Sequence, residues 1–305
     1  MHVTAGIFGN PEIAKKLGKA GSGNDIIMYN HASSDGVFTY VHPNSERIHS
    51  LLQVIGMIDV PIVVFSEMTK EFGEQLVALD AAGFENGFLV LDGIPEDQMR
   101  TAIRGSSLEK FELVDNDPVV IKQKLMAIDY RRDNIGSPWI PVDNYFNVKG
   151  IGTVVLSVVK RGTIKKFDVL KLEPLGKDVT VKDMQSQDKA VTEAVAGMRL
   201  GINLKGVDAE ELKRGYVLCK QAKLSKEVTI NFSKSRYCKE ELEKDKQLFV
   251  AVGLQVITGT LISVEEDKLM IKLEHPLVYA SNEKSIIAST RQILPRIIGN
   301  GIIVG

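Results

Sequence analysis

The sequence predicts an α/β domain followed by two all-β barrels. Residues 1–136 alternate short apolar segments with stretches of helical periodicity, which is typical of an open parallel sheet covered by helices. Residues 131–141 are polar, contain one glycine and two prolines, and have the composition of a linker. Beyond them, short strands follow one another with turn residues between them, as in small β-barrels. We therefore expect an α/β domain at 1–136, a middle barrel at 137–221 and a C-terminal barrel at 222–305.

In the α/β domain, strands are predicted at residues 3–8, 25–29, 36–41, 60–65 and 87–91. The segments 60–65 and 87–91 are continuously apolar, as strands buried on both faces of a parallel sheet should be. Helices are predicted from residue 11 to 17, at 46–57 with Ser45 as the N-cap, at 70–82, and at 119–129 after Pro118.

In the middle barrel, strands are predicted at residues 154–159, 169–172, 200–204 and 217–220. In the C-terminal barrel they are predicted at 228–232, 248–255, 260–264, 269–273 and 301–304. Glycine, aspartate and proline turns separate these segments, and a break near Ala222 divides the two barrels.

Composition excludes several classes of function. The formal net charge is −1, so no global field draws the chain to DNA, RNA or a membrane, and any RNA contact must come from local patches. The two cysteines, Cys219 and Cys238, do not make a disulfide framework. The longest apolar run, residues 60–65, is far too short to span a membrane, and the N-terminus lacks a signal layout. We expect a cytoplasmic protein with neither membrane nor DNA as a partner.

The middle barrel carries the most specific motifs. Its phrases are Phe146-Asn147-Val148-Lys149-Gly150-Ile151-Gly152-Thr153-Val154-Val155, Lys160-Arg161-Gly162, Ala196-Gly197-Met198-Arg199-Leu200-Gly201, Lys205-Gly206-Val207 and Arg214-Gly215-Tyr216-Val217-Leu218. In this order they resemble the second domain of elongation factor Tu and of SelB, its selenocysteine-specific relative. Glycines at the corners of any barrel would explain the residue type but not the order. The resemblance implies a translation elongation factor.

The C-terminal barrel matches more loosely. Val252-Gly253, Thr258-Gly259-Thr260 and Arg296-Ile297-Ile298-Gly299-Asn300-Gly301 look like the barrel of selenocysteine factors and of initiation factor 2 gamma. The compact three-domain layout is most similar to archaeal, methanogen-type paralogues of the family, including one associated with pyrrolysine.

The resemblance also implies a GTPase site in the α/β domain, and the sequence departs from it. The family's phosphate loop, Gly-His-Val-Asp-His-Gly-Lys-Thr, falls on residues 9–16. Gly9 and Lys15 keep the first glycine and the lysine, whereas Ala14 replaces the second glycine and Lys16 the hydroxyl that holds Mg²⁺. Pro11 removes one backbone donor from the phosphate cradle.

The other nucleotide motifs are equally altered. The Asp-x-Pro-Gly-His motif falls on residues 41–45, where Val41 cannot hold the Mg²⁺ water and Ser45 replaces the histidine that positions the attacking water. Asp92 stands where the guanine-reading aspartate should follow a strand, although a solvated turn aspartate is an equal alternative. Phosphoryl transfer depends on positioning and charge stabilisation, so we expect no catalytic residue and no efficient GTP hydrolysis. GTP stays open as a bound cofactor through Gly9, Lys15 and Asp92.

The resemblance further implies that the aminoacyl end of tRNA binds beside the middle barrel. Asp143 and Asn144 fall on the pair just before the first barrel strand, where selenocysteine factors have Asp-Arg. Arg199 matches a second arginine of that pocket, and Phe146 the aromatic beside the terminal adenine. With one arginine lost, selenocysteine is disfavoured and another amino acid is open. A plain surface pairing of Arg199 with Asp143 is the alternative interpretation.

Nine cations are candidates for phosphate contacts with RNA. They are Lys160, Arg161, Lys165, Lys166, Lys234, Arg236, Lys239, Arg291 and Arg296. The five histidines show no spacing typical of a metal site, and no metal is expected.

Three hypotheses follow. In the first, the chain is a tRNA-binding translation factor whose GTPase is weakened or lost, with the ribosome as a further partner. In the second, it is a working GTP-binding elongation factor with an unorthodox site. In the third, its barrels dock on another translation factor or on the ribosome as a regulatory module.

Overall fold

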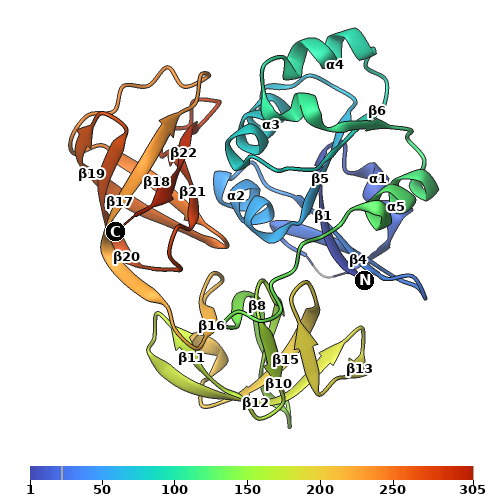
Figure 1. The fold of residues 1–305 in the computed structure, drawn as a ribbon, viewed down its shortest axis with the longest axis vertical. Helices are drawn as coiled ribbons and strands as arrows, with labels where there is room; N and C mark the ends of the chain where they lie inside the picture. Colours follow the sequence, from blue (N-terminus) through green and yellow to red (C-terminus); the bar gives the residue numbers. More distant parts are fainter. Residues whose placement is uncertain (22, 305) are drawn as a thin grey trace.

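The computed structural model describes residues 1–21 and 23–304, and it has three parts, drawn in Figure 1. An α/β domain comes first in the chain. A middle barrel lies below it in this view, and a C-terminal barrel lies beside it. The predicted fold class, an α/β domain followed by two β-barrels, is confirmed. The exact division at residues 136 and 221 stays a prediction.

The sheet of the α/β domain contains β1 (His2–Gly9), β2 (Lys19–Ala20), β3 (Ile26–Ala32), β4 (Val37–Pro43), β5 (Val60–Phe65), β6 (Phe88–Leu91) and β7 (Glu112–Val114). The strand order is β2-β3-β4-β1-β5-β6-β7. From β4 to β7 all neighbours are parallel, whereas β3 runs antiparallel to β4 and β2 antiparallel to β3. The predicted parallel sheet is thus present from β4 to β7, and β2 and β3 add an antiparallel edge to it, where a short hairpin connects β3 to β4 directly.

Helices cover both faces of this sheet. They are α1 (Glu12–Leu17), α2 (Ile48–Met57), α3 (Lys70–Ala82), α4 (Glu96–Ile103), α5 (Pro118–Ala127) and the 3₁₀ helix η1 (Ser107–Lys110). One apolar core joins the sheet to α2, α3 and α4, and another joins it to α1 and α5. Thr69 caps α3 by accepting a hydrogen bond from the Phe72 N–H, and Asp117 caps α5 by accepting one from the Val119 N–H.

The predicted N-cap of α2 is wrong. The helix begins at Ile48 rather than at Glu46, and Arg47 is its N-cap residue. The Ser45 Oγ accepts a hydrogen bond from the Arg47 N–H at 3.1 Å, so it closes a bend before the helix instead of capping it.

The middle barrel is closed by six strands, β8 (Trp139–Val148), β9 (Gly152–Val158), β11 (Val169–Glu173), β12 (Lys177–Ser186), β15 (Arg199–Lys205) and β16 (Val217–Cys219). They follow the order β11-β16-β8-β9-β15-β12, and pairing of β11 with β12 completes the ring. The accessory elements are β10 (Thr163–Lys165), β13 (Lys189–Ala190), β14 (Glu193–Val195) and the 3₁₀ helix η2 (Ala209–Glu211).

The C-terminal barrel is closed in the order β17-β20-β19-β18-β21-β22. Its strands are β17 (Lys223–Lys234), β18 (Gln247–Val252), β19 (Gln255–Glu265), β20 (Lys268–Tyr279), β21 (Lys284–Ser289) and β22 (Ile297–Ile303). The predicted strand at residues 248–255 is wrong in extent, because a turn at Gly253, where φ is +54°, splits it between β18 and β19.

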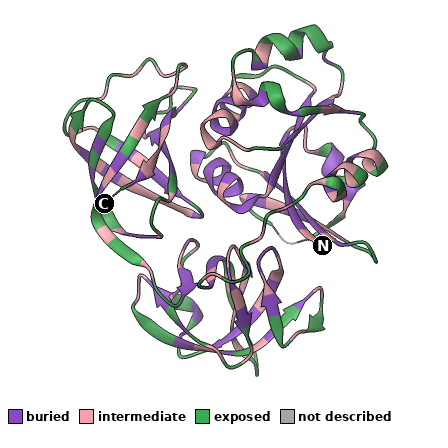
Figure 2. Ribbon diagram, viewed as in Figure 1, coloured by how far each residue is buried: buried purple, intermediate pink, exposed green. Residues whose placement is uncertain are grey.

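Each barrel has its own apolar core, and the α/β domain shares one with the C-terminal barrel. Ala251, Leu254 and Ile297 of the barrel belong to the same cluster as Leu51 and Val54 of α2. Figure 2 shows the buried residues concentrated on the strands and on the helix faces that meet them. In the described part of the chain, no helix has the length and apolarity needed to cross a membrane.

Candidate functional site

The carboxyl ends of the parallel strands carry a compact polar cluster around Asp92. Asp92 follows β6 directly, and its Oδ2 accepts a hydrogen bond from Asn10 Nδ2 at 2.8 Å. Its Oδ1 accepts one from Asn116 Nδ2, which follows β7, at 3.0 Å. The structure thus brings Asp92 close to Gly9 through the neighbouring Asn10. Both carboxylate oxygens already accept one amide hydrogen bond each, so a guanine would have to share this carboxylate with Asn10 and Asn116.

The backbone donors of the Gly9–Glu12 loop are also engaged. The Gly9 N–H donates to Gln75 Oε1 at 2.8 Å, and the Glu12 N–H donates to Asn10 Oδ1 at 3.1 Å. The Asn10 N–H faces the Val64 carbonyl at 3.4 Å, and Pro11 has no N–H. A phosphate cradle depends on free N–H groups at a helix start. In this loop, protein acceptors occupy the donors.

Lys15 is not brought together with Gly9 and Asp92. Helix α1 already begins at Glu12, so Ala14 and Lys15 lie inside the helix rather than in a loop that could wrap around phosphate. Ala14 is completely buried, and the Lys15 Nζ donates to Glu12 Oε1 at 2.6 Å on the exposed side of the helix. That pairing raises the pKa of Lys15.

The second nucleotide motif has a structural role here. Val41 is completely buried in the core on the α2 side of the sheet. His42 is nearly buried, and burial lowers the pKa of its imidazole. Val41 has no group that could bind a Mg²⁺ water, and Ser45 closes the bend before α2.

On the middle barrel, the structure brings Asp143 and Arg199 together. The Arg199 Nη2 donates to Asp143 Oδ2 at 2.7 Å, and the two side chains are 13% and 3% exposed. This is the pairing expected in the alternative interpretation, but the pair is buried rather than on the surface. The Asp143 Oδ1 and Arg199 Nη1 are also buried and make no hydrogen bond within residues 1–21 and 23–304.

Asp143 and Asn144 lie inside β8, not before the first barrel strand, so that expectation is wrong. The pairing of β8 with β9 shifts register between Val142 and Asn144, which places Asp143 in a bulge. The bulge turns Asp143 toward Arg199 on β15. The exposed Asn144 accepts a hydrogen bond at Oδ1 from the Tyr145 N–H at 2.8 Å.

Phe146 lies further along β8 and is 42% exposed. It is paired with Val154, whereas Arg199 is paired with Val158 at the other end of β9. The four predicted aminoacyl-site residues therefore lie on two strands, β8 and β15, on either side of β9, with the ion pair at one end and the exposed ring toward the other.

Two of the nine candidate phosphate contacts are wrong, because their charges are buried between domains. The Lys160 Nζ donates to the Met57 carbonyl at the end of α2 at 2.6 Å, and burial lowers its pKa. Arg296 is 6% exposed and donates to the Glu74 carboxylate from Nε at 3.0 Å and from Nη2 at 2.5 Å.

Arg214 and Gln53 are not among the predicted site residues, yet their side chains join all three parts of the molecule. The Arg214 Nη1 donates to Gln53 Oε1 at 3.0 Å and to Asp25 Oδ2 at 2.7 Å. The Arg214 Nε donates to the Asp143 carbonyl at 2.9 Å. The Gln53 Nε2 donates to the Leu254 carbonyl at 3.2 Å. The only signal in the sequence is the Arg-Gly phrase of the middle barrel.

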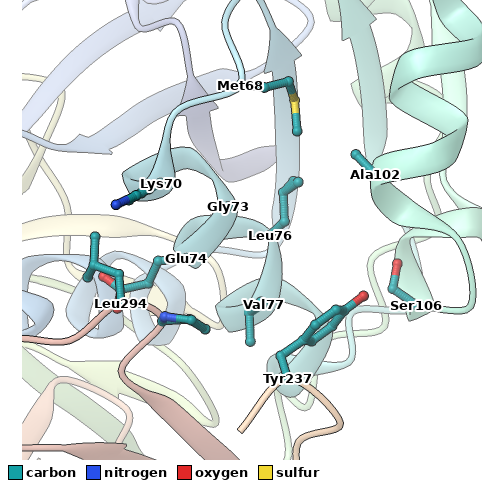
Figure 3. A pocket seen from close by; sticks show the side chains of 11 residues that line it. Met68, Lys70, Gly73, Glu74, Leu76, Val77, Ala102, Ser106, Tyr237 and Leu294 are labelled. Atoms are coloured by element: carbon teal, nitrogen blue, oxygen red, sulfur yellow. The ribbon is translucent and has the colours of Figure 1, made fainter. Parts of the chain in front are cut away.

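Two cavities lie between the α/β domain and the C-terminal barrel, apart from the predicted site residues. One, of about 310 Å³, is lined mainly by apolar side chains of α3 and by Leu294 and Pro295. Figure 3 shows the Tyr237 ring between Val77 and Ser106 at its edge. The other, of about 860 Å³, is more polar and reaches the linker at Tyr130 and Arg132. Within residues 1–21 and 23–304, no cluster of three His, Cys, Asp or Glu side chains is placed to hold a metal ion.

Family models match both barrels. Residues 152–219 match the model of elongation factor Tu domain 2. Residues 219–303 match the model of the C-terminal part of initiation factor eIF2 gamma.

Among individual proteins, the uncharacterized protein MJ0325 of Methanocaldococcus jannaschii is 34% identical over 98% of both chains. The selenocysteine-specific elongation factor of the same organism is 30% identical over 52% of this chain and 34% of its own length.

Two solved structures share the fold. SelB of Methanococcus maripaludis, in complex with the GTP analogue GppNHp, aligns with a TM-score of 0.87 at 20% identity, covering 100% of this chain and 79% of that one. The bacterial selenocysteine-specific factor EF-Sec aligns with a TM-score of 0.82 at 22% identity, covering 99% of this chain and 58% of that one.

Proposed function

Since the chain belongs to one family with MJ0325, a SelB-like group related to elongation factor Tu, we propose that it binds aminoacyl-tRNA and that its GTP binding and hydrolysis are weakened or lost. The observation that carries the proposal is the Gly9–Glu12 loop, whose donors are engaged by the protein itself beside two complete barrels. A cytoplasmic location and the ribosome as a further partner belong to the same proposal.

The loss of GTP chemistry is supported at each position that the reaction needs. Lys16 stands in place of the Mg²⁺ hydroxyl, Val41 is buried, and Ser45 is used in a bend. Because phosphoryl transfer gains its rate from metal, charge and water positioning together, a site without these groups would not turn over at a useful rate. Asp92 with its two amide partners favours a structural role for that carboxylate.

RNA binding is supported by the distribution of charge along the chain. Residues 1–138 contain 12 Lys and Arg against 19 Asp and Glu, whereas residues 139–305 contain 26 against 20. The barrels are therefore cationic and the α/β domain is acidic, although the whole chain is nearly neutral. Phosphate groups would be attracted to the barrels and repelled by the domain that binds nucleotide in GTPases.

The buried ion pair bears on which amino acid is carried. Asp143 neutralises Arg199, and Asn144 is uncharged, so no free cation of this group faces an incoming side chain. A selenolate would find no partner here. We propose that the site receives an aminoacyl group other than selenocysteine, with Phe146 beside the terminal base.

The test compares tRNA charged in bulk with the twenty standard amino acids with the same tRNA after deacylation. We expect tighter binding of charged tRNA by filter assay, with an affinity that falls as salt rises. The Phe146→Ala variant should lose about tenfold in affinity, since stacking of a base on an aromatic ring contributes about 1–3 kcal/mol. Phe167→Ala is the matched control, because Phe167 is also exposed on the middle barrel, at 69%. Equal binding of charged and deacylated tRNA at every salt concentration would refute the proposal.

A second arm examines the nucleotide. Binding of GTP with Mg²⁺ at 100 times its Kd would stabilise the fold by about 2.7 kcal/mol and raise its melting temperature. We expect no such rise at millimolar GTP and no heat of binding. A clear thermal shift with turnover would instead support the unorthodox GTPase. Ribosome binding without any tRNA binding would support the regulatory module.

A further inference from the structure

The turn between β18 and β19 is wedged between the α/β domain and the middle barrel. A Cβ on Gly56 of α2 would lie 2.0 Å from the Gly253 carbonyl oxygen, and one on Gly215 would lie 3.0 Å from that of Leu254. Only glycine lets the backbones approach so closely at Gly56. The turn therefore fixes the distance between α2 and the loop that precedes β16.

Two polar side chains lie in this junction and are hydrogen-bonded in series. Gln53, 9% exposed, donates from Nε2 to the Leu254 carbonyl and accepts at Oε1 from Arg214. The Arg214 guanidinium continues to Asp25 through Nη1 and to the Asp143 carbonyl through Nε. A planar guanidinium makes these contacts in a fixed geometry. The series thus runs from the C-terminal barrel through α2 to the middle barrel.

The end of the series is the candidate aminoacyl site. The Asp143 carbonyl held by Arg214 belongs to the bulge whose side chain pairs with Arg199. A bulge residue has lost its regular ladder partner, so its position depends on such added contacts. Asp25 completes the support. Burial alone would raise the pKa of Asp25, but the Arg214 hydrogen bond and charge outweigh it and lower that pKa, so Asp25 is ionised near neutral pH.

We infer that Gln53 and Arg214 are positioning residues. Their hydrogen bonds connect α2 and the Gly253–Leu254 turn to the Asp143 backbone, so the position of Asp143 follows the position of these two elements. The candidate aminoacyl site is thereby held in one domain arrangement even when no nucleotide is bound. The inference rests on the proposed function for the identity of the ligand. Its structural part, a fixed arrangement maintained by this series of hydrogen bonds, can be measured without any ligand.

The test uses the full chain with Gln53→Leu and, as a milder second variant, Arg214→Lys. Leucine fills a similar volume without hydrogen bonds, and lysine keeps the charge without the planar fork. Gln98→Leu and Arg100→Lys on the exposed helix α4 are the matched controls. Three readouts are compared: small-angle X-ray scattering, the emission of Trp139 at the start of β8, and the Kd for bulk-charged and deacylated tRNA.

We expect both junction variants to show a larger radius of gyration and altered Trp139 emission without nucleotide. Their Kd for charged tRNA should rise about tenfold, as expected for losing a hydrogen bond to a charged group. Their Kd for deacylated tRNA should change less than twofold, and so should the Kd values of the two control variants.

If both junction variants have the same radius of gyration and the same Trp139 emission as the wild-type chain, the inference is overturned, whether or not the Kd changes. A rise in Kd alone would mean that these side chains touch the ligand. If the wild-type chain does not distinguish charged from deacylated tRNA, the proposed function fails, and the scattering of the variants still decides the structural part.

Discussion

Buried charges at the scale of single residues connect the parts of this molecule. Arg132 of the linker donates to Asp59 Oδ1 at 2.7 Å from Nη1 and to Oδ2 at 2.9 Å from Nη2. The Thr4 N–H adds a third donor to Oδ2 at 2.8 Å. Burial by itself would raise the pKa of Asp59, but Arg132, Lys160 and the Thr4 N–H outweigh it, so its pKa lies below the usual value. Asp59 is thus kept ionised between β1, the linker and the middle barrel.

Because the pKa of Asp59 is lowered in the folded state, we expect the chain to lose part of its free energy of unfolding in acid. A pKa depressed in the folded state means that Asp59 stabilises the fold above its unfolded pKa of 3.8, and that this stabilisation is lost as pH falls further. Asp59→Asn should lower the free energy of unfolding by about 3 kcal/mol at pH 7, because it leaves Arg132 buried without a counter-charge. The difference from wild type should shrink as pH falls from 4 toward 3.

Urea unfolding followed between pH 7 and pH 3 measures this difference. Asp35→Asn is the control, since Asp35 lies in an exposed turn. A deficit in Asp59→Asn that stays constant over the whole pH range would contradict the assignment.

At the scale of elements, α2 is the most enclosed helix of the α/β domain. Nearly every residue from Ile48 to Met57 is buried, and the side chains contact the sheet, α3 and the C-terminal barrel. Its last carbonyl, that of Met57, accepts a hydrogen bond from the Lys160 ammonium of the middle barrel. Four neighbours therefore fix the position of one short helix.

Two glycine-to-alanine substitutions, one in α3 and one in α2, compare the gain from helix propensity with the cost of a steric clash. Alanine is intrinsically better than glycine inside a helix by about 1 kcal/mol. At Gly73 of α3 a Cβ would meet nothing within 4 Å, so Gly73→Ala should stabilise the chain by up to about 1 kcal/mol. At Gly56 a Cβ would lie 2.0 Å from backbone, so Gly56→Ala should destabilise it by about 2 kcal/mol or more. Thermal melts of both variants measure the contrast, and stabilisation by Gly56→Ala would show that α2 can withdraw from the turn.

The sequence predicted those elements whose signals are local. The bounds of β5 agree with the prediction at 60–65 because a continuous apolar run marks the strand. Those of α3 agree with the prediction at 70–82 because the segment is periodic and has a capping residue. Helix α4 was missed, since only Met99 and Ile103 of its eight residues are buried. The predicted strand at 248–255 is too long because the Gly253–Leu254 turn contains no polar side chain that would mark it.

The candidate site was predictable only in part for the same reason. A family pattern singled out Asp143 and Arg199, which the barrel brings together, and Gly9 and Asp92, which Asn10 connects in the structure. It could not find the partners of Arg214 and Arg296, because Gln53 and Glu74 lie 161 and 222 residues away in the sequence. Contacts between domains leave no periodic signal in either segment.

At the scale of the whole molecule, the α/β domain and the two barrels behave as one packed body. An apolar core crosses from α2 into the C-terminal barrel, and the buried Glu74–Arg296 pair crosses beside it. The middle barrel is tied to the same helix through Lys160 and through Arg214. No part could turn relative to the others without exposing buried charge, which is costly.

This packing predicts a single unfolding transition. Trp139 emission reports the middle barrel, and far-UV circular dichroism reports all three parts, so the two urea curves should coincide. Arg296→Ala should make them separate, since it leaves Glu74 unpaired at the junction with the C-terminal barrel, whereas Arg291→Ala at an exposed position should not. Two separate transitions in the wild-type chain would contradict the prediction.

The position of the Gly253–Leu254 turn has a consequence for how long a bound ligand stays on the chain. A carrier protein whose helix moves when its nucleotide is hydrolysed can release its ligand at that step. Here the helix is blocked by backbone on one side and held by a glutamine and a lysine contact on the others. On the proposed function, aminoacyl-tRNA bound to the middle barrel would leave by spontaneous dissociation or by transfer to a stronger acceptor, so its off-rate would be a fixed property of the complex.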